Sequence, residues 1–178
     1  RHWGVLPLTF KNNKPYVQVV AEQEDGSQLT LNLLIDSGAS HALSLYQTAN
    51  EQIYVPDNSI YSKLGTGLSG GVEGHLGKIN RLFLDKFQLP NVVTQYPSEE
   101  DIHHAIVMSS RDGAIGADIL KRFKVMFNYH DSTVIFTPSK YFDEPFKYNR
   151  AGLEVISVFP GVPIYEIAYI RPESPGEK

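Results

Sequence analysis

The chain has 178 residues, of which 42% are hydrophobic, 20% charged and 11% aromatic, and its formal net charge is −4. This composition fits one globular domain with a substantial core plus some further sequence, and it excludes disordered, collagen-like and coiled-coil chains. Basic residues form no run that would favour nucleic-acid binding, and no apolar stretch approaches the ~20 residues of a membrane helix. Cysteine is absent, which excludes disulfides, thiolate catalysis and cysteine–zinc sites.

The first part of the chain has the pattern of β-strands. Residues 5–10 and 16–21 are short apolar runs, separated by a turn-like polar segment. A hairpin turn is predicted at 24–27, where Gly26 can adopt a positive φ. Residues 28–35 then alternate apolar and polar positions, which predicts a strand with one buried face. The residues on that face are Leu29, Leu31, Leu33 and Ile35.

That strand ends on a carboxylate, in the sequence Asp36-Ser37-Gly38-Ala39. An Asp after a strand is ordinarily a turn former, because its side chain bonds nearby backbone amides. Here Gly38 leaves room for a substrate or a second backbone to come close, and Ser37 adds a hydroxyl. Asp36 is therefore a candidate catalytic residue.

The middle of the chain is rich in glycine. Residues 41–52 are ambiguous and could hold a short helix, whereas 65–77 contain six glycines in thirteen positions and predict a mobile hairpin tip. The tip comprises Gly65, Thr66, Gly67, Leu68, Ser69, Gly70 and Gly71. A phosphate-binding loop is excluded, since the segment lacks Gly-Lys-Ser/Thr. Short strands are predicted at 78–84, 87–89 and 91–95.

The histidines are candidates for metal binding or for tuning a carboxylate. His103 and His104 follow an acidic segment in which Ser98 predicts a helix start. Adjacent histidines rarely point the same way, so we predict no metal site and no cofactor. His41 is interpreted as a surface residue, and His75 as a solvated one.

The last part of the first domain contains two apolar residues followed by glycine, namely Ala114, Ile115 and Gly116. A helix is predicted at 117–123 and a hairpin from strands 124–128 and 133–137. Two prolines and several aromatic residues in 138–149 then suggest a linker packed onto the first domain, and the remainder is too short to fold alone.

The turn at Asp36, preceded by Leu34 and Ile35, resembles the active-site turn of bacterial-type, single-domain retropepsin-like aspartic peptidases. The resemblance extends in order to the glycine-rich segment, as a flap, and to Ala114, Ile115 and Gly116 leading into a helix and a strand. It implies an all-β closed barrel with one short helix over residues 1–140.

This resemblance implies an endopeptidase with Asp36 as catalytic acid and base, an active-site loop of Ser37, Gly38 and Ala39, and a flap over a polypeptide substrate. No second Asp-Ser/Thr-Gly exists in the sequence. Arg111-Asp112-Gly113 follows a polar run and is interpreted as a surface turn. The expected partner of Asp36 is therefore Asp36 of a second copy, in a homodimer.

Two departures from the family pattern are evident. Ser40 replaces the Asp common in retroviral enzymes, and residues 65–77 contain no tyrosine. Two alternatives also stay open, because each retains Asp36. One is an inactive peptidase-like module for dimerisation or peptide binding; the other is a chain activated by a different partner with its own Asp-Ser/Thr-Gly loop.

The end of the chain, residues 165–178, resembles the opening of a PDZ domain, in which an apolar strand precedes a Ser-Pro turn; the alternative is an irregular tail. The expected organisation is a peptidase domain at 1–140, a linker at 141–152 and an incomplete PDZ-like segment at 153–178. The start at Arg1 without methionine suggests a processed piece. An exported bacterial protein, periplasmic or associated with the cell envelope, is the expectation.

Overall fold

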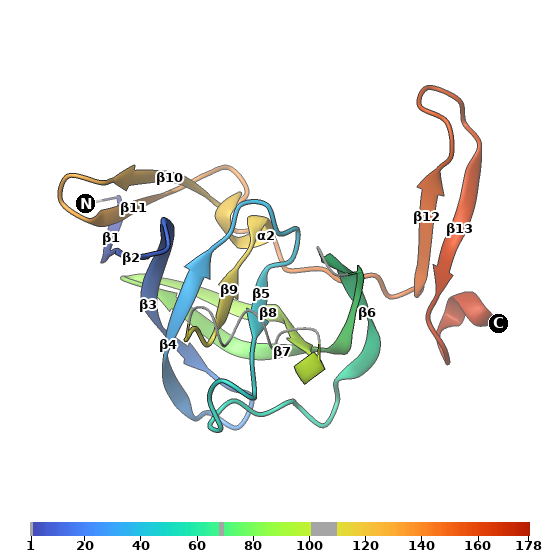
Figure 1. Ribbon diagram of the computed structural model, residues 1–178, viewed down its shortest axis with the longest axis horizontal. Helices are drawn as coiled ribbons and strands as arrows, with labels where there is room; N and C mark the ends of the chain where they lie inside the picture. Colours follow the sequence, from blue (N-terminus) through green and yellow to red (C-terminus); the bar gives the residue numbers. More distant parts are fainter. Residues whose placement is uncertain (1, 68–69, 101–109) are drawn as a thin grey trace. The chain divides into compact units, whose positions relative to one another are not determined.

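The computed structural model describes residues 2–67, 70–100 and 110–178 (Figure 1). The chain divides into two compact units, Arg1–Phe146 and Lys147–Lys178. The domain limits expected from the sequence stay predictions.

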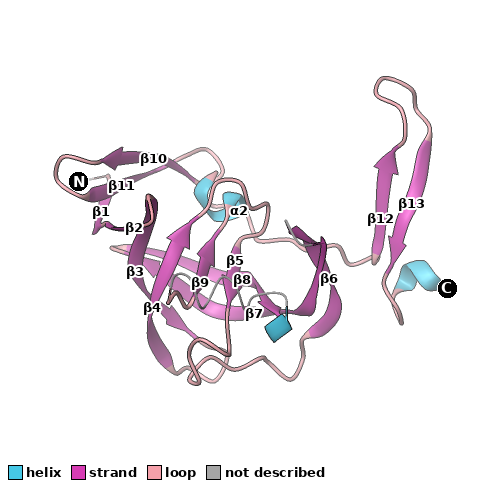
Figure 2. Ribbon diagram, in the orientation of Figure 1, coloured by secondary structure: helices cyan, strands magenta, loops and turns pink. Residues whose placement is uncertain are grey.

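The first unit is built almost entirely of β-strands (Figure 2). Its elements are β1 (Gly4–Pro7), β2 (Thr9–Lys11), β3 (Lys14–Glu22), β4 (Gln28–Ile35), β5 (Leu43–Leu45), β6 (Ile60–Gly67), β7 (Gly70–Leu84), β8 (Phe87–Pro97), β9 (Gly113–Ile115), α2 (Ala117–Leu120), β10 (Phe123–Asn128) and β11 (Thr133–Pro138).

A closed barrel forms the centre of this unit. Its sheet has the order β2-β3-β4-β9-β5-β8-β7-β6. An additional antiparallel pairing of β3 with β7, from Val20↔Phe83 to Glu22↔Arg81, joins the sheet to itself. The ring β3–β4–β9–β5–β8–β7 therefore has no free edge, while β6 extends outside it as a hairpin with β7. Over the residues that the structure describes, the prediction of an all-β closed barrel with one short helix is confirmed.

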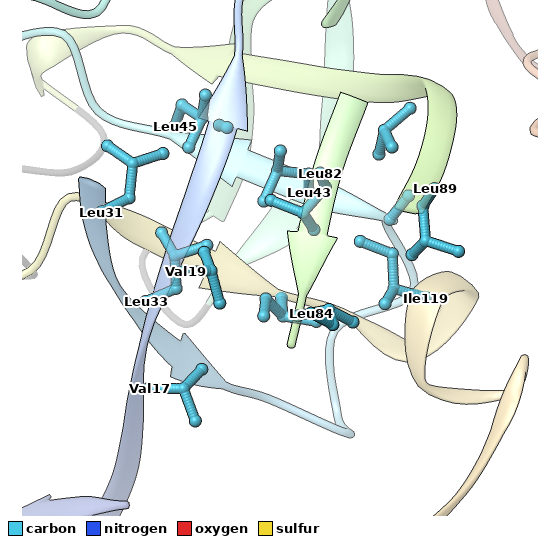
Figure 3. Close-up of a cluster of buried hydrophobic side chains, with 14 of the residues drawn as sticks. Val17, Val19, Leu31, Leu33, Leu43, Leu45, Leu82, Leu84, Leu89 and Ile119 are labelled. Atoms are coloured by element: carbon cyan, nitrogen blue, oxygen red, sulfur yellow. The ribbon is translucent and has the colours of Figure 1, made fainter. Parts of the chain in front are cut away.

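The barrel interior is filled by aliphatic side chains from alternate strand positions (Figure 3). The alternation predicted for β4 is confirmed, since its apolar face is buried at Leu29, Leu31, Leu33 and Ile35. Strands β5, β7 and β8 contribute further residues to the same core, among them Leu43, Leu45, Leu82, Leu84 and Leu89. Because a one-residue slip would turn this face to solvent, the core fixes the register of the strands.

The predicted strand at 5–10 is divided in two. Leu8 is buried and its N–H donates to the Ser132 carbonyl at 2.8 Å. This contact separates β1, which pairs with β11, from β2, which pairs with β3. The final hairpin, β10 with β11, is confirmed and forms with β1 a three-stranded sheet.

Other boundaries also differ from the sequence-based prediction. No helix forms within 41–52: Leu43 and Leu45 enter the core with the period of a strand, and β5 inserts between β8 and β9. The predicted strands 87–89 and 91–95 are the single strand β8. Helix α2 ends at Leu120, because Phe123 already begins β10.

The helix expected after Ser98 falls mostly on residues 101–109, which lie outside the described residues. Glu99 and Glu100 have helical backbone. The remainder of that helix stays a prediction.

The second unit is a small hairpin. Strands β12 (Leu153–Ser157) and β13 (Tyr165–Ile170) pair antiparallel, and the 3-10 turn η1 (Pro175–Glu177) follows. A hairpin and one turn do not define a PDZ domain, so that part of the resemblance stays a prediction.

Arg122 is a fully buried charged side chain at the end of the barrel near α2. Its Nε donates to the Asp118 carbonyl at 3.0 Å, and its Nη1 donates to the carbonyls of Tyr141 and Glu144. The guanidinium also lies 3.7 Å from the centroid of the Phe146 ring. These contacts hold residues 141–146, which follow β11, against the rest of the first unit, as the sequence predicted.

Replacing Arg122 by Met should lower the free energy of unfolding by about 2–4 kcal/mol, because the carbonyls of Asp118, Tyr141 and Glu144 lose their common donor at once, at part-buried positions. The matched control is Lys121→Met on the neighbouring exposed side chain, for which we expect about 0–1 kcal/mol. Equal effects of the two substitutions in denaturant titrations would contradict this role of Arg122.

Candidate active site

Asp36 lies directly after β4 and continues its pairing with β9. The last β4–β9 pair is Ile35↔Ile115, and the Asp36 N–H donates to the Ile115 carbonyl at 2.9 Å. The carboxylate is half-buried, and its Oδ1 accepts a hydrogen bond from the Gly38 N–H at 3.0 Å. This Asx turn holds the carboxylate in one orientation at the rim of the barrel. In the described part of the chain no hydrogen bond or ion pair engages the other oxygen, Oδ2.

The segment Ala114–Gly116 lies against the Asp36 loop, as the resemblance implies. Strand β9 runs between β4, to which it is parallel, and β5, to which it is antiparallel. After it, the Gly116 N–H donates to the Ala42 carbonyl at 2.8 Å, and the Ala117 N–H to the Ala39 carbonyl at 2.7 Å. A Cβ at Gly116 would collide with the carbonyl oxygen of His41. Only glycine therefore permits this approach.

The other residues of the predicted loop have distinct positions. Ser37 and Gly38 are exposed, whereas Ala39 is half-buried. The resemblance to retropepsin-like peptidases also implies that the Ser37 hydroxyl braces the loop against its copy across a dimer, and this contact stays a prediction.

Asp112 has a structural role that the sequence did not indicate. Its Oδ2 accepts from the Asn32 N–H at 2.7 Å, and its backbone bonds both Asn32 and Tyr46. The interpretation of Arg111-Asp112-Gly113 as a surface turn is thus wrong, because this segment ties β4 to the end of β5 just before β9 begins. Asp112 is engaged in this junction and is no substitute for a second catalytic Asp.

His41 is half-buried, so its interpretation as a surface residue is wrong. Its Nε2 is buried and has no hydrogen-bond partner among the residues that the structure describes. Burial lowers the pKa of His41, opposed by the charge of Asp36 and a hydrogen bond to the Ala114 backbone, while the Arg111 charge lowers it further. The net effect of this environment favours the neutral form of the imidazole.

Tyr46 and Arg111 complete this polar neighbourhood and were missed by sequence reasoning. Tyr46 is buried, with the Arg111 guanidinium 5.5 Å from its ring centroid, and burial raises the pKa of its hydroxyl. The signal for Tyr46 was available: it continues the two-residue alternation of β5, on the face opposite Leu43 and Leu45.

The predicted glycine-rich hairpin is confirmed, with Gly65↔Val72, Thr66↔Gly71 and Gly67↔Gly70 as its outermost described pairs. Leu68 and Ser69 lie outside the described residues. The hairpin connects to the Asp36 loop through β8 and β5, whereas Ala114–Gly116 contact the loop directly.

The hairpin is longer than predicted and begins at Ile60. The interpretation of His75 as a solvated residue is wrong, because it is half-buried and its Nδ1 lies 3.0 Å from the Ser59 Oγ. Its ring also packs edge-on with that of Tyr61, with 5.4 Å between the two ring centroids. Tyr61 places a tyrosine on the hairpin outside the segment 65–77 that the sequence delimited.

Among the residues that the structure describes, no group of three or more His, Cys, Asp or Glu could hold a metal ion. His103 and His104 lie outside these residues. Over the same described ranges, no helix has both the length and the apolar character needed to cross a membrane.

Comparisons with known proteins give structural likeness alone. No protein-family model and no curated protein sequence matches the chain. A crystal structure of a retropepsin-like aspartic protease from Rickettsia conorii matches with a TM-score of 0.49 and 13% identity, over 76% of this chain and 90% of that one. Basic 7S globulin from soybean matches with a TM-score of 0.49 and 10% identity, over 86% of this chain and 55% of that one. At these values neither structure assigns an activity to this chain.

The substitution Gly116→Ala should displace the Asp36 loop and lower the free energy of unfolding by about 1–3 kcal/mol, because its Cβ has no space beside the His41 carbonyl. The control is Gly71→Ala, where an added Cβ meets nothing within 4 Å. Thermal unfolding of both variants tests this, and a tolerated alanine at 116 would contradict the described approach.

We expect His41 to lower the free energy of unfolding as the pH falls below neutral. Because burial lowers its folded-state pKa below the ordinary 6.5, the unfolded chain binds the proton more tightly, so this contribution is present above pH 6.5 and lost as pH falls through the folded-state pKa. We expect His41→Asn to reduce the loss of stability between pH 7 and pH 5. His130→Asn, at a side chain that is 94% exposed, should leave that loss unchanged.

Proposed function

We propose that this protein is an aspartic endopeptidase whose active form is a homodimer, with Asp36 contributed by each copy. The observation that carries the proposal is the position of Asp36: a half-buried carboxylate, oriented by Gly38 and held at the barrel rim by β9 and the turn at Gly116. A turn that served only to reverse the chain would not require the close approach that Gly116 permits.

The chemistry needs two such carboxylates. Two carboxyl groups at close range cannot both ionise, so they share a proton and their apparent pKa values separate. A water molecule between them attacks the peptide carbonyl, with one carboxylate as general base and the other as general acid. Neither a nucleophilic side chain nor a metal takes part in this step. The β6–β7 hairpin serves as the flap over the bound polypeptide.

The second carboxylate comes from another copy, because the sequence has one Asp-Ser-Gly and Asp112 is engaged elsewhere. An exposed apolar row on the β1–β11–β10 sheet supports such a dimer. Val5 and Met126 both pair with Ile135, so the three side chains lie on one face of this sheet. Val5 is 40% exposed on that face and Met126 is 59% exposed. We assign a second copy of this chain to that face.

The activity is tested with the full chain and an unfolded polypeptide as substrate, at acidic and neutral pH. Asp36→Asn should reduce cleavage by at least about 10³-fold, since it removes the shared acid and base while preserving shape. Asp57→Asn, at an exposed turn, is the matched control. Undiminished cleavage by the Asp36 variant would exclude the mechanism, and an inert wild-type protein would favour the binding-module alternative.

The dimer is tested on the same preparations by analytical ultracentrifugation. Met126→Asp should yield monomers and abolish cleavage, whereas Ile156→Asp, at an exposed apolar position of the second unit, should leave both unchanged. A wild-type monomer that cuts peptides would rule out a shared dyad.

A further inference from the structure

One row of paired residues crosses the barrel wall from the Asp36 strand to the β6–β7 hairpin. Leu34 pairs with Ala114, Ala114 with Ser44, Ser44 with Gln95, and Gln95 with Leu76. Paired residues place their side chains on the same face of a sheet, here the face opposite the Leu33 and Leu43 core. Alternation along the strand puts Asp36 on the face of Leu34, so Gln95 shares a face with the candidate catalytic residue.

A β-bulge in the hairpin lies above this row. Lys63 pairs with Glu73 and Gly65 with Val72, so Leu64 is an extra residue without a cross-strand partner. Its carbonyl accepts a hydrogen bond from the Gln95 side-chain Nε2 at 2.9 Å, at a part-buried position. This contact joins the first strand of the hairpin to β8, which lies two strands away in the sheet order.

The hairpin needs such a contact because its outer part has little other support. The last β7–β8 pair is Gly74↔Pro97, and one further backbone bond follows it, from the Ser98 N–H to the Glu73 carbonyl at 2.9 Å. Among the described residues, the cross-strand pairs beyond that bond join 65–67 to 70–72. A two-stranded ribbon is marginally stable in water by itself. The hairpin backbone passes close to β8 at Gly74, where a Cβ would collide with the Tyr96 carbonyl oxygen. The outer part of the hairpin thus separates from the barrel sheet at Gly74 in β7 and at the Leu64 bulge in β6.

We propose that Gln95 is a positioning residue that latches the bulge at Leu64 and so sets the working position of the β6–β7 hairpin. The proposal rests on the proposed function in that this hairpin acts as the flap. Gln95 acts through Leu64 and leaves the chemistry to Asp36. It couples the flap to the wall that carries the catalytic carboxylate, because the same strand segment of β8 pairs with β5.

The test compares hydrogen–deuterium exchange of the hairpin amides in wild-type protein, Gln95→Met and Gln88→Met. Methionine retains the length of glutamine but cannot donate, and Gln88 is an exposed residue of the same strand outside the hairpin. Amides of 64–67 and 70–73 should exchange about fivefold faster in the Gln95 variant, the factor that corresponds to one net hydrogen bond. Amides of β3 and β4 should be unchanged, as should all amides in the Gln88 variant.

A second variant and a kinetic measurement guard against a purely structural effect. Gln95→Asn keeps the amide but is one methylene shorter, and should accelerate hairpin exchange as Gln95→Met does. In peptide cleavage both variants should raise KM about fivefold with kcat within about twofold, the pattern for lost positioning of bound substrate. Hairpin exchange within twofold of wild type in both variants, or equal acceleration throughout the barrel, would overturn the proposal. The exchange result is independent of catalysis, so it stands or fails separately from the Asp36 variant.

Discussion

The insertion of β9 between β4 and β5 is the constraint on which the rest of the first unit depends. Three residues of backbone pass between two strands, and glycines at both ends permit the passage. A Cβ at Gly113 would collide with the Ser44 carbonyl oxygen, as one at Gly116 would with that of His41. This insertion completes the barrel ring and also supplies the carbonyl that fixes the Asp36 backbone. Core closure and site geometry therefore have the same physical origin.

The two-residue period of the strands places the core residues and the candidate site residues on opposite faces of the barrel wall. One face of β4, β5 and β9 fills the aliphatic core with residues such as Leu33, Leu43 and Ile115. The other face carries Asp36, Tyr46 and the row of paired residues that includes Gln95. A polar substitution on the second face can therefore alter the site without opening a cavity in the core.

Much of this fold could be predicted from local patterns. The alternation in 28–35, the glycine-rich hairpin and the final hairpin all formed where the sequence placed them, because each depends on neighbouring residues alone. The helix suggested within 41–52 was wrong because β5 is stabilised by β8 and β9, which lie far along the chain. The interpretation of His41 as a surface residue was wrong for the same reason. Its environment includes the backbone of Ala114, which lies more than seventy residues away in the sequence.

The sequence by itself determined the residues of the candidate site, because two patterns identify them. One is an apolar strand followed by Asp-Ser-Gly, and the other is a later segment of two apolar residues and a glycine. It also determined that the chain holds one such Asp loop, and hence that a dyad requires a partner. Only the tertiary structure decided that Asp112 bonds to Asn32 and Tyr46, that His41 is half-buried and that the Gln95 side chain bonds to the bulge at Leu64. These three depend on contacts between strands distant in sequence, which form when the barrel closes and have no local signature.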